Sequence, residues 1–399
     1  MGRPTLEVAD IVREYRGAYE ALRGGELPPS ESRVLDDIVH CRTAFFGGHL
    51  LRCDECGHED ISYNSCRNRH CPKCQAAARA EWLAEREREL LPVQYFHVVF
   101  TIPKEIAPLA LLNKRIVYGI LLQTSAETLR QVAASPKYLG AEIAILSVLH
   151  TWGQNLQHHP HVHCVVPGGG ISPDESHWMH CRDGFFLPVK VLGKLFRGKF
   201  LARLRTEYDK GLLELGHGSI EMRADGSRFK EWLSALYEKD WVVYAKRPFG
   251  GPQQVQRYLA SYTHRTAISN HRLVSLREGK VWFRWKDYAH GCRRRVMSLA
   301  ATEFLRRFLL HVLPKGFVRI RHYGFLANRH RSAKLELCRE LLRSEKAESA
   351  SAGHRRESAV PEDAFPCPAC ESGLMCRVYR FEAGEAPPSC RAPSPPRPP

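Results

Sequence analysis

Two spacings of apolar residues alternate along the chain from residue 93 onward. Short runs rich in Val, Ile and aromatic residues are typical of β-strands, whereas apolar residues recurring every three or four positions are typical of α-helices. We predict strands at 95–102, 142–151, 159–167, 241–246, 271–276 and 281–285. We predict helices near 107–135, 188–215, 227–239, 253–263 and 298–312. Hairpin-like neighbours, such as the strands joined by 277–280 with Gly279 in the turn, favour an α+β fold with a largely antiparallel sheet.

The two ends of the chain differ in composition and patterning from the segment that begins at residue 93. Residues 1–47 predict a helical lead-in, and a Cys-rich block then extends to residue 74. The highly charged segment 75–91 predicts a connecting helix that Pro92 ends. Beyond about residue 340, Ser, Ala, Glu, Arg and finally Pro dominate, which predicts a low-complexity, disordered tail. We therefore divide the chain into three units, 1–91, 92–335 and the tail 336–399.

Charge and composition narrow the class of protein. The 399 residues include 59 Lys and Arg against 43 Asp and Glu, a net charge of +16, which predicts a polyanionic partner such as nucleic acid. No stretch reaches the roughly 18 consecutive apolar residues of a membrane span. Charges at Glu7, Asp10 and Glu14 argue against a secretory signal. The 14 Cys residues then point to a reducing compartment, where clustered thiols bind metal more often than they form disulfides.

Two CxxC pairs stand in the Cys-rich block, separated by 14 residues. Each pair can close a tight turn with both sulfurs facing one ion, and two pairs complete a tetrahedral zinc shell. We predict one structural Zn²⁺ held by Cys53, Cys56, Cys71 and Cys74. Neighbouring residues could replace a ligand, lie around the site or form a second one: Cys66, His70, Cys41 and His49. The alternative is that the two pairs are unrelated redox or buried cysteines.

His161 and His163 bracket one apolar residue in a strand-like run, so their imidazoles project from the same face of the sheet. Two imidazoles on one face can hold a divalent metal and leave positions open for substrate. Gln154, seven residues before His161, is our candidate for a third, oxygen ligand. Histidines on a solvated face are the alternative interpretation.

Tyr258 and Tyr262 are four residues apart in a predicted helix that begins near Pro252, so their rings share one helix face. This spacing permits two hydroxyl nucleophiles side by side. Together with Val255 and Leu259, the same two tyrosines also fit an ordinary core stripe. The motif becomes informative only beside the Cys pairs, the His pair and the basic charge.

In combination these motifs resemble the two-tyrosine rolling-circle transposases of the HUH nuclease superfamily, of the insertion sequence ninety-one type. The resemblance extends from about residue 35 to residue 332. Residues 47–75 resemble that family's zinc-binding domain, 159–170 its histidine–hydrophobic–histidine motif, 257–273 its two-tyrosine helix and 319–331 its downstream region. A departure lies near the C-terminus: Cys367-Pro-Ala-Cys370 resembles half a zinc knuckle, but Cys376 and Cys390 form no second CxxC, so we assign no zinc there.

The resemblance implies an HUH-nuclease-like, five-stranded antiparallel sheet flanked by helices, with the His pair on a central strand and the tyrosines on a facing helix. A small zinc-ribbon-like domain would precede it. It further implies Mg²⁺ or Mn²⁺ at His161 and His163, with a third ligand that varies in the superfamily among Glu, Gln and His. Tyr258 or Tyr262 would attack single-stranded DNA at transposon ends and target and form a 5′-phosphotyrosine. Such an enzyme would be a bacterial cytoplasmic protein, associated with the nucleoid when bound to DNA, with no membrane partner.

Basic residues in the ribbon and the later strands are candidates for contacts to DNA phosphates. They are Arg67, Arg69, Arg293, Arg294, Arg295, Arg319, Arg321, Arg329 and Arg331. Two other functions compete with the transposase. An HUH replication initiator or relaxase would use the same chemistry, but the N-terminal ribbon argues against it. A non-catalytic zinc-containing DNA-binding protein, such as a decayed transposase, is disfavoured by the intact His and Tyr pairs.

Overall fold

The computed structural model describes residues 4–75, 82, 85–216, 226–249, 265–287, 291–327, 329–347, 365–370 and 372–390. Its largest sheet has five strands in the order β12-β4-β5-β3-β8, and every neighbouring pair is antiparallel. The strands are β3 (Tyr95–Thr101), β4 (Ala144–Trp152), β5 (His158–Pro167), β8 (Val243–Phe249) and β12 (Ile320–Gly324). The expected α+β fold with a central antiparallel sheet is confirmed, and β5 is its middle strand.

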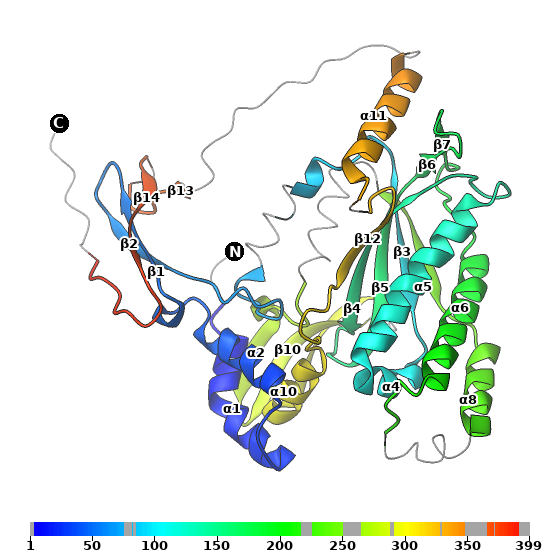
Figure 1. The fold of residues 1–399 in the computed structure, drawn as a ribbon. Coiled ribbons are helices and arrows are strands. Elements are labelled where there is room, and N and C mark those ends of the chain that lie inside the picture. Colours follow the sequence, from blue (N-terminus) through cyan, green and yellow to red (C-terminus); the bar gives the residue numbers. More distant parts are fainter. Residues whose placement is uncertain are drawn as a thin grey trace.

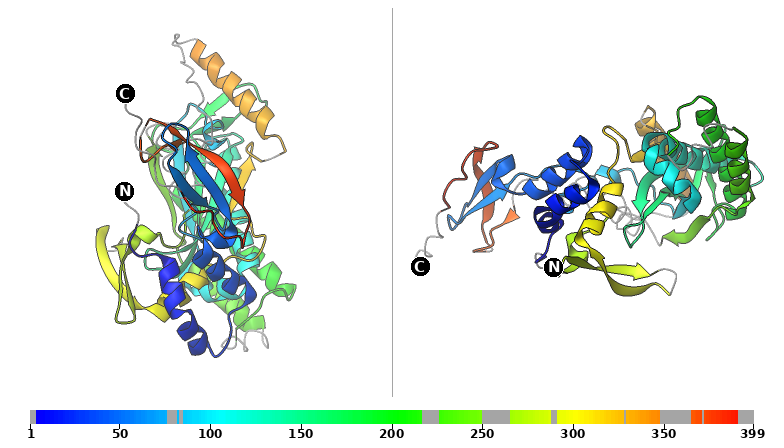
Figure 2. Two further views of the ribbon diagram at one scale, coloured as in Figure 1. Left: turned by 90° about the vertical axis from the view of Figure 1, so that its left-hand side faces the viewer. Right: turned by 90° about the horizontal axis from the view of Figure 1, so that it is seen from below.

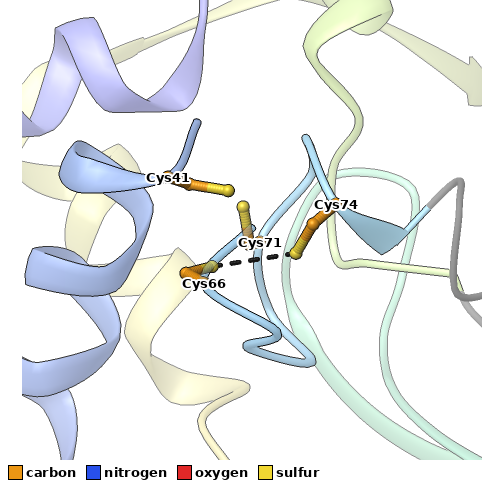
Figure 3. A group of neighbouring side chains, drawn as sticks. All are labelled: Cys41, Cys66, Cys71 and Cys74. Carbon is orange, nitrogen blue, oxygen red and sulfur yellow. Dashed lines mark hydrogen bonds between the residues drawn. The ribbon is translucent and has the colours of Figure 1, made fainter. Parts of the chain in front are cut away.

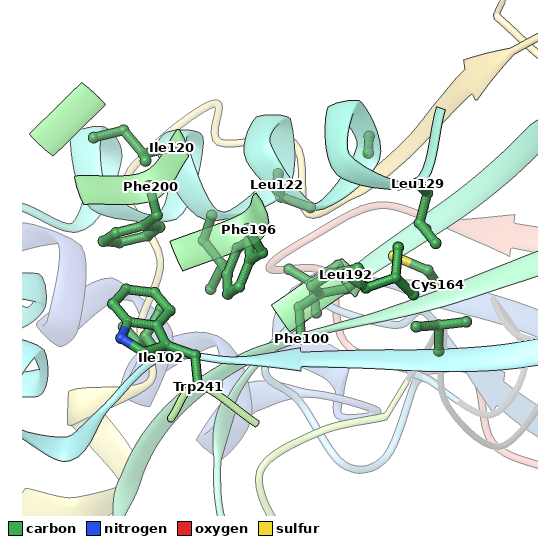
Figure 4. Close-up of a cluster of buried hydrophobic side chains, with 14 of the residues drawn as sticks. Phe100, Ile102, Ile120, Leu122, Leu129, Cys164, Leu192, Phe196, Phe200 and Trp241 are labelled. Atoms are coloured by element: carbon green, nitrogen blue, oxygen red, sulfur yellow. The ribbon is translucent and has the colours of Figure 1, made fainter. Parts of the chain in front are cut away.

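Helices cover one face of this sheet (Figure 1). They are α4 (Ala107–Leu112), α5 (Lys114–Ala134), α6 (Val189–Asp209) and α8 (Gly226–Glu238). Figure 4 shows the core between the sheet and these helices, in which Phe100 of β3 and Cys164 of β5 lie against Leu129 of α5 and Phe196 of α6. Because successive strand residues point to opposite faces, burial of Val162 and Cys164 on the helix side directs His161 and His163 to the other side.

A second core joins the N-terminal helices to a later part of the chain. Helices α1 (Val8–Arg23) and α2 (Pro29–His40) share this core with α10 (Ala301–Leu310) and with the sheet β11-β10-β9. Its strands are β9 (Leu273–Arg277), β10 (Lys280–Asp287) and β11 (Arg293–Ala300). The predicted β9–β10 hairpin is present, and Glu278 and Gly279 both have positive φ, as a two-residue turn of type I′ requires. The predicted boundary at residue 91 therefore does not separate two cores.

The third sheet combines the two ends of the chain, in the order β13-β14-β1-β2. It contains β1 (Gly48–Cys53), β2 (Glu59–Tyr63), β13 (Phe365–Pro366) and β14 (Leu374–Phe381). Strand β14 pairs antiparallel with β1 over its whole length. Figure 2 shows this sheet at one end of the molecule, the α1–α2–α10 core in the middle and the five-stranded sheet at the other end.

The expectation of a disordered tail over 336–399 does not hold for its described parts. Helix α11 runs from Arg331 to Ala347, and Leu335, Cys338 and Leu342 bury one face of it. Residues 365–381 then form β13 and β14, in which Met375 and Phe381 are almost wholly buried. The physical reason is positional: a few apolar residues at helix or strand spacing suffice to dock a segment whose average composition is polar.

Smaller elements complete the described chain. Strands β6 (Gly169–Ile171) and β7 (Trp178–His180) form a hairpin after the Gly run, and three short 3₁₀ turns are η1 (Ala44–Phe46), η2 (Lys104–Ile106) and η4 (Asn270–Arg272). Strand β11 was not predicted and overlaps the start of the helix expected at 298–312. The helix expected at 253–263 and most of the connecting helix at 75–91 lie outside the described residues. Among the helices described, none is long and apolar enough to cross a membrane.

Candidate functional site

Three histidines meet on the face of the central sheet that lies opposite helices α5 and α6. His161 and His163 lie two residues apart on β5, and His150 of β4 stands directly opposite His161 in the antiparallel register. One ligand nitrogen from each of the three lies within 4.8 Å of the others. His150 and His163 are buried and His161 is partly exposed. The arrangement is a cluster of three imidazoles that could hold one metal ion.

Hydrogen bonds orient two of the three rings. The Nδ1–H of His161 donates to the backbone carbonyl of His159 over 2.7 Å. The Nδ1 of His163 lies 2.8 Å from Nε2 of His97, a buried residue of β3. When Nδ1 carries the hydrogen, the lone pair is on Nε2, which is the state of a metal-ligating histidine. The sequence analysis missed His97, although its one signal was present: a histidine inside the otherwise apolar run Tyr95–Thr101.

Burial keeps these imidazoles neutral. It lowers the pKa of His161 to about 4 and the pKa of His163 well below its usual range. Neighbouring His150, His97 and the Arg265 guanidinium shift the His163 pKa in the same direction. A neutral imidazole is the form that binds a metal ion, so the cluster is ready to bind at neutral pH.

Gln154, the predicted third ligand, does not lie opposite the His pair. Strand β4 ends at Trp152, and Gln154 lies in the turn that follows, where its backbone carbonyl accepts a hydrogen bond from Arg272. The residue that completes the cluster is His150, which faces His161 because of the β4–β5 register.

Tyr258 and Tyr262, the predicted nucleophiles, lie outside the described residues. The described chain leaves the sheet at Phe249, the end of edge strand β8, and resumes at Arg265. Arg265 is three residues after Tyr262, and its charge acts on both His161 and His163. Its backbone carbonyl also accepts a hydrogen bond from Arg319 over 3.3 Å.

The Cys-rich block holds a first group of four thiols, Cys41, Cys66, Cys71 and Cys74, which point toward one another in Figure 3. Their sulfurs lie within 4.8 Å of one another, and those of Cys66 and Cys74 are 3.7 Å apart. Cys41 follows the last residue of α2, and the Asn68 N–H donates to the Cys66 sulfur over 3.4 Å. Cys41, Cys71 and Cys74 are also buried in the core of α1 and α2. Three of the four thiols are buried and Cys66 is partly exposed, and four thiols complete a tetrahedral shell, as expected of a structural site.

The predicted set of Cys53, Cys56, Cys71 and Cys74 around one ion is therefore corrected. Cys71 and Cys74 join Cys41 and Cys66, whereas Cys53 and Cys56 join Cys367 and Cys370. The separation arises because Cys53 ends strand β1, which leads away from the core in which Cys71 and Cys74 are buried.

Neither histidine named as an additional zinc candidate joins a cysteine group. The Nε2 of His70 accepts a hydrogen bond from the Leu313 N–H over 3.4 Å. His49 lies within β1, where it pairs with Arg380 and Ser62. Among the described residues, the groups that could hold a metal are the two sets of cysteines and the three histidines.

Comparison with known proteins decides the family. A family model described as "Transposase zinc-binding domain" matches residues 11–102, and one described as "Putative transposase" matches residues 144–334. "Putative transposase y4qJ" of Sinorhizobium fredii is 52% identical over 396 residues, which cover 98% of this chain and 99% of that protein. The chain belongs to the IS91 family of transposases.

This membership confirms the resemblance drawn from the motifs. The transposase is also 26% identical over 325 residues to the "Transposase for insertion sequence element IS801" of Pseudomonas savastanoi pv. phaseolicola, over 77% of this chain and 73% of that one. No solved structure matches. As an IS91-family transposase the protein binds DNA, cleaves it and transfers strands, and it carries an N-terminal zinc-binding domain.

The arginines predicted to bind DNA in this transposase differ in exposure. Three are at least partly buried and are engaged by the protein: Arg69 donates to the Phe317 carbonyl, Arg331 pairs with Glu89 at 3.1 Å, and Arg319 donates to the Arg265 carbonyl. Burial lowers the pKa of Arg319 to about 10.

The other predicted arginines are accessible to solvent. Arg293, Arg294 and Arg295 are exposed along β11, and Asp287 lies 3.4 Å from the last of them. Arg67 and Arg329 are exposed, and partly exposed Arg321 donates to the Val318 carbonyl. The strand β11 is therefore the densest accessible basic segment of the predicted set.

Proposed function

We propose that this transposase acts by rolling-circle-type cleavage and transfer of single-stranded DNA through 5′-phosphotyrosine intermediates. Tyr258 and Tyr262 are the nucleophiles, and His150, His161 and His163 hold the catalytic divalent metal. The observation that carries the proposal is the three-histidine cluster on the two central strands of a five-stranded antiparallel sheet.

The donor set fits a divalent transition metal. Imidazole nitrogens bind ions such as Mn²⁺ well, whereas Mg²⁺ prefers oxygen ligands. The cluster offers three imidazoles, two of which have Nδ1 engaged by His159 and His97. We therefore expect Mn²⁺ to serve better than Mg²⁺. Bound there, the ion would polarise the scissile phosphate and offset the charge that develops during transfer.

The protein's own residues supply position, charge and the nucleophile. A tyrosine hydroxyl has a pKa near 10 and is a weak nucleophile until its proton leaves. On attack, the bond from tyrosine oxygen to phosphorus forms and the bond from phosphorus to the 3′ oxygen breaks, which releases a 3′ hydroxyl. No water is consumed, so the reverse attack by a 3′ hydroxyl can rejoin a strand. The second tyrosine permits a second cleavage while the first DNA end stays attached.

Arg265 supports the placement of the nucleophiles. Its charge acts on His161 and His163, so it lies at the edge of the histidine cluster. Tyr262 precedes Arg265 by three residues in the sequence. A tyrosine side chain adds several ångströms of reach toward the phosphate. Arg265 itself presents a positive charge where a DNA phosphate would bind.

Zinc serves the N-terminal domain rather than the chemistry. We assign one structural Zn²⁺ to Cys41, Cys66, Cys71 and Cys74. A zinc–sulfur distance of about 2.3 Å places tetrahedral sulfurs about 3.8 Å apart. The 3.7 Å between the Cys66 and Cys74 sulfurs agrees with that geometry.

The test is covalent capture of single-stranded DNA by the purified full-length protein in Mn²⁺. Wild-type protein is expected to form a protease-sensitive adduct with an oligonucleotide that contains the element end. Tyr258→Phe or Tyr262→Phe alone should leave one adduct-forming residue, whereas the double variant should form none and still bind DNA. His161→Ala and His163→Ala should abolish the adduct. Tyr244→Phe, which changes an exposed tyrosine of β8, is the matched control. An adduct in the double variant would refute the proposal.

A further inference from the structure

The two ends of the chain bring four further thiols together, far from the histidine cluster. Cys53 ends β1 and Cys56 follows it, and Cys367 and Cys370 follow β13, more than three hundred residues later. The sulfurs of Cys53 and Cys370 are 3.7 Å apart, and those of Cys56 and Cys367 are 3.8 Å apart. All four lie within 4.8 Å of one another. We propose that they hold a second structural Zn²⁺, which clasps the C-terminal hairpin to the N-terminal ribbon and makes the two ends of the chain one domain.

The distances match a metal and not a disulfide. Tetrahedral sulfurs about 2.3 Å from a zinc ion are about 3.8 Å apart, whereas a disulfide requires about 2.05 Å. Both measured separations fall at the tetrahedral value. The four cysteines are free thiols in the structure.

Backbone N–H groups point at the sulfurs from both turns. The Cys56 N–H donates to the Cys53 sulfur at 3.5 Å, the Ala369 N–H to Cys367 at 3.4 Å and the Gly373 N–H to Cys370 at 3.4 Å. Hydrogen bonds of this kind stabilise the thiolate, which is the form that binds zinc. Both CxxC turns therefore present backbone donors to their sulfurs.

The CxxC turn at Cys53–Cys56 packs tightly against the segment that follows the CxxC turn at Cys367–Cys370. A Cβ on Gly373 would lie 2.4 Å from the Cys53 sulfur and 2.8 Å from Cβ of Glu55, so only glycine fits there. The Asp54 N–H donates to the Leu374 carbonyl at 3.1 Å, and the Leu374 N–H donates to the Asp54 carboxylate at 2.7 Å. These reciprocal bonds fix the second CxxC against the first.

Apolar packing alone is too small to hold this end of the molecule. The cluster of buried side chains here consists of Leu51, Cys53, Cys367 and Met375, so half of it is cysteine. A core of this size does not normally stabilise a fold, and small zinc domains commonly obtain that stability from metal binding. Strand β14 also places Phe381 over Gly48, where a Cβ would lie 2.7 Å from the Phe381 ring.

The second zinc site extends the zinc-binding domain to the C-terminal hairpin. The matching family model covers residues 11–102 and contains only Cys53 and Cys56 of this group. The ribbon is complete only when residues 365–381 are present. A chain that stops after α11 would keep the histidine cluster and the first zinc and lose the second.

The experiment measures the number of zinc ions per full-length chain by elemental analysis. In a second sample Co²⁺ replaces zinc, and its sulfur-to-cobalt absorption reports the tetrahedral thiolate sites. Cys367→Ser/Cys370→Ser and Cys53→Ser/Cys56→Ser are the test variants, and Cys376→Ser/Cys390→Ser is the control, because these two exposed thiols lie in the same segment. We expect two ions in the wild type and the control and one in each test variant, with the sulfur-to-cobalt absorption halved. Two ions in Cys367→Ser/Cys370→Ser, or one ion in the wild type that both test variants keep, would overturn the proposal.

A conservative ligand exchange guards against loss of folding. Cys370→His keeps a zinc ligand at the same position, so it should retain two ions. Its cobalt spectrum should lose about a quarter of the sulfur-to-cobalt intensity of this one site. An unchanged spectrum would show that Cys370 is not a ligand. DNA cleavage is not the readout in either experiment, so the clasp and the proposed nuclease mechanism can fail separately.

Discussion

His97→Phe should weaken metal binding at the histidine cluster without removing a ligand. The Nε2 of His97 lies 2.8 Å from Nδ1 of His163, and both residues are buried. Phenylalanine keeps the ring and the packing but cannot accept the hydrogen bond that holds His163 with Nε2 toward the metal. Loss of such an outer partner typically costs 10- to 100-fold in metal affinity, which is about 1.4–2.7 kcal/mol. We expect the Mn²⁺ concentration for half-maximal adduct formation to rise by that factor.

The assay is the initial rate of covalent adduct formation against Mn²⁺ concentration. At saturating Mn²⁺ the rate of His97→Phe should return to within a few-fold of wild type, because the three ligands remain. His97→Gln, whose amide oxygen can accept the same hydrogen bond, should recover most of the affinity. His322→Phe makes the same change on β12 of the same sheet, outside the cluster, and should leave the curve unmoved. An unchanged Mn²⁺ requirement in His97→Phe would refute this account of the site.

Three further predictions follow from the same structure. His150→Gln exchanges a nitrogen for an oxygen ligand, so the ratio of Mn²⁺- to Mg²⁺-supported adduct formation should fall; an unchanged ratio would exclude His150 as a ligand. Changing Arg293, Arg294 and Arg295 to Gln should reduce the slope of log affinity for single-stranded DNA against log salt by up to about 2, since each phosphate contact contributes about 0.7; equal slopes would place the DNA elsewhere. Burial lowers the pKa of His311 to about 3, and its ring is held by Leu156 and Thr151. Between its unfolded pKa near 6.5 and about 3, the unfolded chain binds a proton that the fold excludes. The stability from neutral His311 is therefore full above pH 6.5 and lost as pH falls, by about 2 kcal/mol at pH 5. Urea unfolding of His311→Gln should show a shallower loss between pH 7 and 5 than wild type, and an equal loss would contradict the assignment.

Periodicity and local motifs predicted the part of the site that is local in sequence. The alternation around His161 and His163 placed both imidazoles on one strand face, and β5 has them there. His150 could not be found in the same way. Its place opposite His161 depends on the register of the β4–β5 hairpin, which is set by the turn between Trp152 and His158. A choice based on sequence distance selected Gln154, which lies in that turn.

The grouping of the cysteines was predicted wrongly because it depends on contacts between distant segments. Closeness in the chain suggested that Cys53 and Cys56 share an ion with Cys71 and Cys74, but each CxxC is a local turn that does not determine its partner. The partner of the first pair comes from Cys367 and Cys370 through the pairing of β14 with β1. Such a contact between distant segments leaves no local periodicity, and the polar composition around it concealed the strand. Met375 and Phe381, near the two ends of β14, are the buried residues of this strand.

The most direct test of the central claim is to identify the residue that carries DNA. Wild-type transposase is incubated with single-stranded DNA that contains the element end and Mn²⁺, digested with protease and nuclease, and the modified peptide is sequenced by mass spectrometry. The account predicts a nucleotide 5′-phosphate on Tyr258 or Tyr262. A nucleotide on any other residue, such as Tyr244 or Tyr323, would contradict it, and so would cleavage of the element end by wild-type protein with no covalent peptide at all.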